Sequence, residues 1–310
     1  MTRLTVGLQG GSGFIGSALA NELIKRGHSL VISTRKLSNA RELRILPNTK
    51  IIEVDMNRQE ELDRCFSQCN CVVNLIGILN EKKDNGVGFN YAHVELASRL
   101  NQACKVNNID HIVQVSSLGA DIYSDSFYLA SKGKAEELLK AEKNPKIKLT
   151  IIRPSVVFGP EDNFTNNFSL LLKYSRGFMP LPCPDAKLQP VYVNDLAKGI
   201  SNVIENKALA DETYEIGGAD IFTLTEIIKY IATVIGVPNR IIPLNDVFSK
   251  LQANFMEYIP GKPFSKDNFR SLAKGSVCSS DKNLRSLGVK PVPMNQVLPQ
   301  YLTSRSVRDR

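Results

Sequence analysis

A tyrosine and a lysine stand four residues apart in the segment YLASK, as Tyr128 and Lys132. In a helix this spacing places both side chains on one face, one turn apart. A phenol beside an ammonium group could exchange protons with a bound molecule, but two polar residues could equally share a surface by chance. The choice depends on the elements that carry the pair and on what lies upstream of it.

Strand-like and helix-like patterns alternate through the first half of the 310-residue chain. The alternation predicts an α/β fold, a doubly wound parallel Rossmann sheet with helices on both faces. The expected strands are 4–9, 29–34, 50–54, 71–77, 111–116 and 148–153, and the expected helices are about 14–26, 58–68, 90–107 and 126–142. After Pro154 the rhythm breaks, which predicts a smaller C-terminal substrate lobe.

We expect residues 1–157 to form the dinucleotide-binding Rossmann domain and residues 158–310 to form the substrate lobe. Residues 189–235 are an exception, because they contain a strand pattern and a capping box, TLTE, from Thr223 to Glu226. This stretch is expected to weave back into the Rossmann domain. Asp195 within it is interpreted as the N-cap of a helix rather than as a catalytic acid.

The first strand runs into GGSGFIG (10–16), where glycines follow a G-x-x-G-x-x-G spacing. Glycines let the backbone approach a pyrophosphate, and the helix that follows offers free N–H groups and a positive dipole end. A tight structural turn is the alternative. The residues that we predict to bind the cofactor are Gly10, Ser12, Gly13, Phe14, Ile15, Gly16, Arg35, Asp55, Leu75, Gly77, Lys132 and Pro154.

The second strand decides which cofactor fits better. A carboxylate at its end would bind the 2′-hydroxyl of the adenosine ribose, but this chain has Arg35 there, with Lys36 and Arg41 nearby. We therefore expect NADP(H) to be preferred over NAD(H), although Arg35 could also be an ordinary surface charge. Asp55 ends the third strand within reach of the adenine, and residues 74–77 are expected to line the ribose side.

The net charge of +8 is unevenly distributed, because residues 239–310 carry 12 Lys and Arg against 5 Asp and Glu. A basic C-terminal quarter favours an anionic partner, either a membrane surface or an acidic protein, or it is a solvated face. No nucleic-acid recognition motif accompanies the charge. No apolar run approaches the roughly 20 residues of a membrane span. We expect a cytoplasmic protein that attaches peripherally to the cytoplasmic face of the inner membrane.

The six cysteines follow no zinc spacing, so no metal site is expected and the thiols are interpreted as reduced. The three histidines, His28, His93 and His111, are scattered and receive no site role. A cluster of apolar residues in the second half is ambiguous, because it could line a substrate pocket or form the core of the lobe. It comprises Phe164, Phe168, Phe178 and Met179.

In combination, the glycine loop, Ser117, the Tyr128–Lys132 pair and RPSVVFG (153–159) resemble the extended short-chain dehydrogenase/reductase family, also described as NAD-dependent epimerase/dehydratase-like. The resemblance covers about residues 4–235. More narrowly, three segments are similar to the nucleotide-binding accessory subunit of mitochondrial complex I and its bacterial relatives. They are VVNLIG (72–77), FGPEDNFTNNF (158–168) and QPVYVNDLAKGI (189–200).

The resemblance implies that Tyr128 exchanges a proton with a substrate carbonyl or hydroxyl, and that Ser117 orients the substrate oxygen, with Ser116 as the fallback. A free tyrosine, with a pKa near 10, is poorly matched to neutral pH. Lys132 would favour the phenolate and hydrogen-bond the nicotinamide ribose, while the hydride comes from the cofactor.

Two functions follow. The first is an NADP-dependent oxidoreductase that uses a Ser-Tyr-Lys arrangement on a quinone-related, isoprenoid or sugar-nucleotide substrate. The alternative is a non-catalytic NADPH-binding accessory protein of a respiratory or ubiquinone-biosynthesis assembly. The complete set of Ser117, Tyr128 and Lys132 favours the enzyme, and the basic C-terminal quarter favours the accessory protein. The sequence makes no prediction of oligomeric state.

Overall fold

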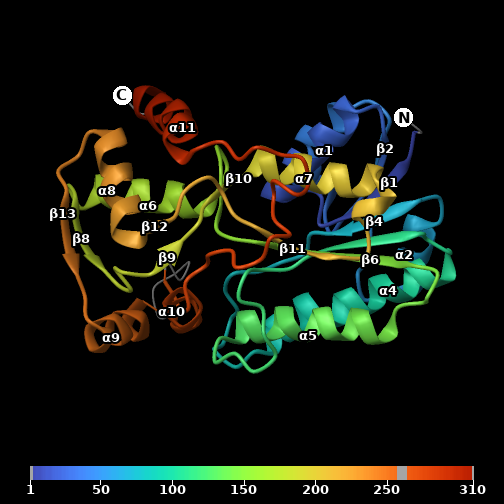
Figure 1. The fold of residues 1–310 in the computed structure, drawn as a ribbon, viewed down its shortest axis with the longest axis horizontal. Helices are drawn as coiled ribbons and strands as arrows, with labels where there is room; N and C mark the ends of the chain where they lie inside the picture. The colour runs from blue at the N-terminus through green and yellow to red at the C-terminus, as the bar shows by residue number, and fades with distance from the viewer. Residues whose placement is uncertain (1–2, 257–263, 309–310) are drawn as a thin grey trace.

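The computed structural model describes residues 3–256 and 264–308, without the side chains of 246, 255, 256 and 304–308. A seven-stranded parallel sheet runs through the larger part of the molecule in the order β11-β6-β5-β4-β1-β2-β3 (Figure 1). The strands are β1 (Thr5–Gln9), β2 (Ser29–Thr34), β3 (Thr49–Glu53), β4 (Cys71–Asn74), β5 (His111–Val115), β6 (Lys148–Pro154) and β11 (Thr213–Ile216). The predicted Rossmann sheet is confirmed.

The order of the strands reverses beside β1. The chain runs from β1 outward through β2 and β3, then returns to β4 and continues outward on the other side. Gln9 at the end of β1 pairs with Asn74 at the end of β4 and with Ser33 of β2. In open α/β sheets, ligands bind in the crevice at such a reversal, outside the carboxyl ends of the strands.

Helices cover both faces of the sheet. On one face α1 (Phe14–Lys25) packs against α7 (Val193–Glu205), and on the other α2 (Gln59–Phe66), α4 (Leu96–Val106) and α5 (Phe127–Glu142) lie together (Figure 1). Every residue of β4 and β5 is buried, as expected for central strands between two helical layers. Short segments join these elements, namely η1 (Leu37–Ala40), η2 (Glu42–Ile45), α3 (Val87–Phe89), η3 (Asn90–Glu95) and η4 (Lys207–Leu209).

The second half builds a smaller lobe beside the carboxyl edge of the sheet (Figure 1). Its helices are α6 (Asn163–Tyr174), α8 (Leu224–Ile235), α9 (Asp246–Met256), α10 (Lys266–Ala273) and α11 (Met294–Arg308). Its paired strands are β7 (Val157–Phe158) with β10 (Val191–Tyr192), β8 (Phe178–Leu181) with β13 (Arg240–Pro243), and β9 (Lys187–Leu188) with β12 (Phe222–Thr223). A separate apolar core, which includes Phe158, Leu172 and Ile228, holds the lobe together.

Between these lobe elements the chain returns to the main sheet, since β11 pairs with β6 and α7 packs on α1. The capping box of α8 is confirmed, with Thr223 and Glu226 bonding reciprocally. The interpretation of Asp195 as an N-cap is wrong, because α7 begins at Val193 with Tyr192 as its N-cap. Asp195 is buried and accepts a 2.8 Å hydrogen bond from the Val292 N–H. No helix of the described ranges is long and apolar enough to cross a bilayer.

Candidate active site

The glycine loop lies at the carboxyl end of β1 and leads into α1. Gly10 has a φ of +80°, which side chains rarely adopt, and a Cβ on Gly16 would lie 2.5 Å from the carbonyl oxygen of Gly11. The helix N-cap is Gly13, and α1 has no side-chain cap and no acidic residue in its first turn. Among the described residues, the N–H groups of Phe14 and Ile15 have no hydrogen-bond partner. The loop therefore fits an anionic group such as a pyrophosphate.

The expected adenosine side is open to solvent. Arg35 directly follows β2 and is exposed, and within residues 3–256 and 264–308 it forms no ion pair. Asp55 is also exposed, and its carboxylate accepts a 3.0 Å hydrogen bond from the Asn57 N–H, which lowers its pKa. At the ends of β1 and β2, Gln9 Oε1 and Ser33 Oγ are buried without a partner in the described structure. A 2′-phosphate on Arg35 is compatible with this arrangement.

Tyr128 lies in the first turn of α5, and its phenol lies beside Ser117, which follows β5 and whose hydroxyl donates to the Leu118 carbonyl oxygen at 3.2 Å. The ring makes edge contacts with Phe89 and His93. Burial raises the pKa of Tyr128, the Ser117 hydroxyl opposes that rise, and the carboxylate of Asp267 adds to it. The phenol is therefore protonated at neutral pH and is suited to donating a proton.

Lys132 lies one turn further along α5 and is 4% exposed. Its Nζ donates to the carbonyl oxygens of Val115 at 3.1 Å and of Ile76 at 3.3 Å, and a Cβ on Gly77 would lie 3.5 Å from it. Burial lowers the pKa of Lys132 to about 8, and Glu136 partly opposes this. The ammonium therefore spans the ends of β4 and β5, beside the predicted ribose side of the site.

Glu136 explains which serine is available. It is almost fully buried and binds Arg153 of β6 through two nitrogens, and the Ser116 hydroxyl donates to it as well. Because Ser116 is engaged by Glu136, the adjacent Ser117 is the hydroxyl beside Tyr128. The sequence offered no signal for the Ser116–Glu136–Arg153 cluster, which fixes α5 on the sheet.

His93 is a site residue that sequence reasoning missed. Its Nδ1 is 2.8 Å from the Ser131 hydroxyl, and its Nε2 accepts a 3.1 Å hydrogen bond from the Ile78 N–H. Burial lowers the pKa of His93 to about 2, so the ring is neutral and links the loop after β4 to α5. A single histidine in a helix pattern carries no signal of such a contact.

A cleft of about 590 Å³ opens between the sheet and the lobe, beginning at Leu118 and Gly119 directly after Ser117. Its charged lining comprises Arg153, Asp185, Lys187, Glu215 and Lys274. The apolar residues singled out from the sequence do not line it. Met179 is buried in the lobe core, Phe164 and Phe168 pack against that core, and Phe178 is 52% exposed. A place in the lobe core is therefore favoured for Met179, Phe164 and Phe168, but not for Phe178.

In the described part of the chain, no three His, Cys, Asp or Glu side chains are grouped so that they could hold a metal ion. The six cysteines are free thiols. Burial raises the pKa of Cys65 to about 12 and that of Cys278 to about 11. The thiols of Cys65 and Cys278 are therefore protonated at neutral pH and poorly nucleophilic.

Known proteins share this architecture. The model of the NAD dependent epimerase/dehydratase family matches residues 6–217, which contain the glycine loop, Ser117, Tyr128 and Lys132. The chain belongs to this family. Its relatives include "NADH dehydrogenase (ubiquinone) 1 alpha subcomplex subunit 9, mitochondrial" of Rattus norvegicus, which is 28% identical over 96% of this chain and 80% of the relative.

The Arabidopsis thaliana protein of the same name is 30% identical to this chain over 82% of its length. The chain spans only 64% of that plant protein's length. Among solved structures, the UDP-glucose 4-epimerase of Thermus thermophilus, in complex with NAD, superposes with a TM-score of 0.75. The superposition covers 97% of this chain and 99% of the epimerase chain, at 19% sequence identity, and establishes a shared fold.

Proposed function

We propose that the protein binds NADP(H) and acts as a short-chain dehydrogenase/reductase-type oxidoreductase on a small molecule. The observation that carries the proposal is the placement of the Tyr128 phenol beside Ser117, with Lys132 one turn away at the same edge of the sheet. These residue types can transfer a proton to a substrate oxygen beside a bound nucleotide.

The cofactor would lie across the reversal of the strand order. The pyrophosphate would bind the free N–H groups at the start of α1, Arg35 would bind the 2′-phosphate, and Asp55 would contact the adenine. Leu75, Gly77, Pro154 and Lys132 would surround the nicotinamide ribose. When bound, the cofactor supplies or accepts a hydride. The epimerase of the same fold is in complex with NAD, which supports the binding of a nicotinamide nucleotide.

The protonated phenol favours the direction of carbonyl reduction. Tyr128 would donate its proton to the substrate oxygen, and Ser117 would hold that oxygen through a second hydrogen bond. Lys132 remains largely charged below pH 8 and would stabilise negative charge that develops on the phenol oxygen. Because Ser117 and Tyr128 already lie side by side, a substrate oxygen has to enter between or beside the two hydroxyls.

The size and lining of the cleft favour one of the three expected substrate classes. Its volume of about 590 Å³ is in the usual range for small-molecule sites. The charged lining suits a polar or anionic molecule better than an isoprenoid chain, so a sugar nucleotide fits best of the three expected classes. The family relative "dTDP-glucose 4,6-dehydratase" of Neisseria gonorrhoeae, 25% identical to the chain, supports this choice.

The direct test is to purify the protein, release and identify any bound nucleotide, and then ask which keto-sugar nucleotides or quinones oxidise bound NADPH. We expect NADPH in the released fraction and substrate-dependent loss of its fluorescence. A protein that binds no nicotinamide nucleotide at all would overturn the proposal.

The second candidate is a non-catalytic NADPH-binding accessory protein of a respiratory or ubiquinone-biosynthesis assembly. It is favoured by the relatives named as subunits of mitochondrial NADH dehydrogenase. In this case nucleotide binding would stabilise the protein, while changes at Tyr128 would leave the assembly intact. Quantifying the assembly in cells that carry Tyr128→Phe or Gly13→Ala separates the candidates, since an accessory protein needs the nucleotide but not the phenol.

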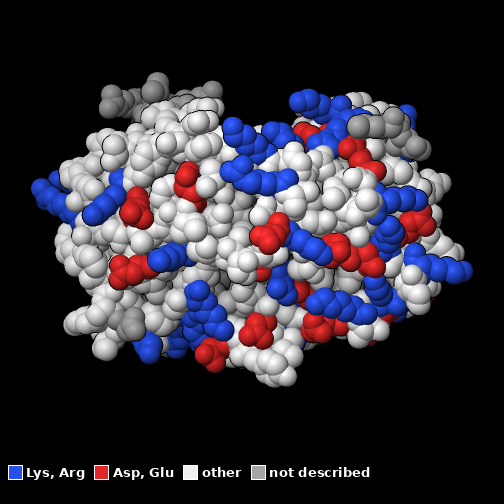
Figure 2. All heavy atoms as spheres, in the orientation of Figure 1, with Lys and Arg blue, Asp and Glu red and all other residues white. Residues whose placement is uncertain are grey.

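We further propose that the protein attaches peripherally to an anionic membrane at the cytoplasmic face. In α9 the apolar side chains of Val247, Phe248 and Leu251 are exposed beside Lys250. The tail charges Arg305, Arg308 and Arg310, with Asp309, lie outside the described side chains, as does much of the segment 254–264. On the face shown in Figure 2, basic side chains are interspersed with acidic ones, so attachment there would be weak and salt-sensitive.

A further inference from the structure

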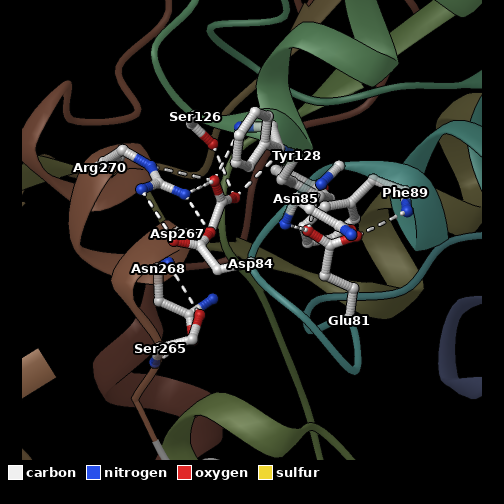
Figure 3. A network of polar contacts seen from close by, with 12 residues as sticks. Glu81, Asp84, Asn85, Phe89, Ser126, Tyr128, Ser265, Asp267, Asn268 and Arg270 are labelled. Atoms are coloured by element: carbon white, nitrogen blue, oxygen red, sulfur yellow. Dashed lines mark hydrogen bonds and ion pairs between the residues drawn. The ribbon is translucent and has the colours of Figure 1, made fainter. Parts of the chain in front are cut away.

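Helix α10, from the lobe, lies against the beginning of α5, the helix that carries Tyr128 and Lys132 (Figure 3). The carboxylate of Asp267 is 3% exposed and accepts three hydrogen bonds from the start of α5. The donors are the Ser126 hydroxyl at 2.9 Å, the Phe127 N–H at 2.7 Å and the Tyr128 N–H at 3.1 Å. A side chain about 140 residues away therefore completes the N-terminus of the helix.

The contact is chemically strong. The first N–H groups of a helix have no partner within the helix, and the positive end of its dipole favours an anion. Ser126 is the N-cap of α5 and accepts a hydrogen bond from the Leu129 N–H while it donates to Asp267. Hydrogen bonds to a carboxylate are roughly twice as strong as neutral ones. Asp267 and Ser126 together satisfy the N–H groups of the first turn.

Arg270 extends the contact to a second segment. Its guanidinium binds Asp267 at 2.9 Å, pairs with Asp84 in the loop after β4, and lies 5.0 Å from the centre of the Phe127 ring (Figure 3). The side-chain amide of Asn268 donates to the Leu79 carbonyl at 3.1 Å. Helix α10 therefore binds both the start of α5 and the loop between β4 and α3.

The same segment forms a wall of the cleft. Ala273 ends α10, and the residues that follow it, Lys274, Gly275 and Ser276, line the cleft beside Leu118 and Gly119. The Ser276 carbonyl accepts a 2.7 Å hydrogen bond from the Ser155 hydroxyl after β6. A molecule in the cleft would therefore touch the segment that holds the first turn of α5.

We propose that Asp267 is a positioning residue, which fixes the first turn of α5, and with it the Tyr128 phenol, from helix α10, whose last residue, Ala273, lines the cleft. The inference rests on the proposed function, in which Tyr128 transfers a proton to the substrate. Asp267 does not contact the cofactor loop, so its role is in orienting Tyr128 rather than in binding nucleotide. Helix α10 thereby couples the lobe that would bind substrate to the tyrosine that would act on it.

The titration of Tyr128 provides a readout that needs neither substrate nor cofactor. The titratable groups beside the phenol are His93 on η3 and Asp267 on α10, with Arg270 bound to Asp267; Lys132 lies one turn further along α5. His93 is neutral over the working range, so it contributes no charge. Removing the Asp267 charge lowers the Tyr128 pKa, and loosening the first turn lowers it further by hydrating the phenol.

The experiment compares Asp267→Asn with Asp281→Asn, an exposed aspartate in the same C-terminal segment. Tyrosine ionisation is followed by ultraviolet absorbance against pH, and Tyr128→Phe in each background is subtracted to isolate Tyr128. Amide hydrogen exchange of residues 127–129 is measured in parallel. We expect Asp267→Asn to lower the Tyr128 pKa and to speed exchange in the first turn, while exchange later in α5 and NADPH affinity stay within about twofold. The control should match the parent protein.

An unchanged Tyr128 titration and unchanged exchange in folded Asp267→Asn would overturn the inference. If Asp267→Asn fails to fold, Arg270→Gln replaces it. This variant keeps the Asp267 carboxylate but removes the ion pairs of Arg270 with Asp267 and Asp84. It should speed amide exchange in the first turn of α5 without speeding exchange later in that helix. Where turnover is measurable, Asp267→Asn should lower kcat about 10- to 100-fold with little change in KM, and Asp267→Glu should recover part of it. A shift in titration without any turnover would contradict the enzyme proposal and leave the positioning role standing.

Discussion

Two glycines of the loop should fail in different ways when each is replaced by alanine. A Cβ on Gly16 would lie 2.5 Å from the Gly11 carbonyl oxygen and 2.6 Å from the Gly11 Cα. Both are backbone atoms, so no side chain can rotate away to make room. A Cβ on Gly13 would meet only the Gly10 carbonyl oxygen, at 3.5 Å, which is an ordinary contact.

The magnitudes follow from these contacts. Overpacking costs about 1–3 kcal/mol, and alanine gains about 1 kcal/mol over glycine inside a helix. Because the obstacle is backbone, we expect the overpacking cost of Gly16→Ala to be about 3 kcal/mol, the upper end of that range. The helix-propensity gain of about 1 kcal/mol offsets part of this cost, so the unfolding free energy should fall by about 2 kcal/mol. At roughly 2–4 °C per kcal/mol for large domains, Tm should fall by about 4–8 °C.

Gly13→Ala should leave Tm almost unchanged, since Gly13 has an extended backbone with a φ of −84°. Its methyl group would instead occupy the open space where the pyrophosphate is proposed to lie. NADPH affinity should therefore fall at least about tenfold, or about 1.4 kcal/mol. Thermal unfolding followed by circular dichroism, with calorimetric NADPH titration, measures both quantities. An unchanged Tm for Gly16→Ala, or parental affinity for Gly13→Ala, would refute the reasoning.

Three further changes test the cofactor, the lysine and the membrane. Arg35→Asp should remove a preference for NADPH over NADH of about 10- to 150-fold, the value of one charge-assisted hydrogen bond, while Arg240→Asp in the lobe should not. Because burial lowers the pKa of Lys132 from 10.5 to about 8, NADPH affinity should fall as pH rises through about 8. The unfolded chain binds the proton more tightly, so the unfolding free energy should rise with pH between those two values, and Lys132→Arg should abolish both trends. Anionic vesicles should sediment the protein at low salt and release it at high salt, and deleting residues 305–310 should weaken sedimentation; absence of low-salt binding would count against membrane attachment.

Much of the sheet could be predicted from the sequence, because parallel strands buried on both faces are continuous apolar runs. The run 29–34 matches β2, and 111–116 differs from β5 by one residue. The run 71–77 was predicted too long, since β4 ends at Asn74. Residues 75–77 are apolar in part, but they leave the sheet to form the loop beside Lys132.

The contacts that orient the site could not be predicted, because they join residues far apart in the chain. Asp267 reads as an ordinary acidic residue at the start of a helix, and nothing local indicates that it caps a second helix. The neutral state of His93 follows from burial by elements that the sequence specifies only collectively. The local pattern around Asp195 predicted a helix N-cap. That prediction was wrong because the Asp195 carboxylate accepts a tertiary hydrogen bond from the Val292 N–H instead.

The replacement of Tyr128 by phenylalanine tests the central claim most directly. The variant keeps the ring and its contacts with Phe89 and His93, and loses only the hydroxyl beside Ser117. NADPH affinity and substrate-dependent NADPH oxidation are measured on the same preparation, once a substrate has been found by the screen described above. We predict affinity within about twofold of the parent and turnover lower by about 100-fold or more. Turnover equal to that of the parent protein would contradict a proton-transfer role for Tyr128.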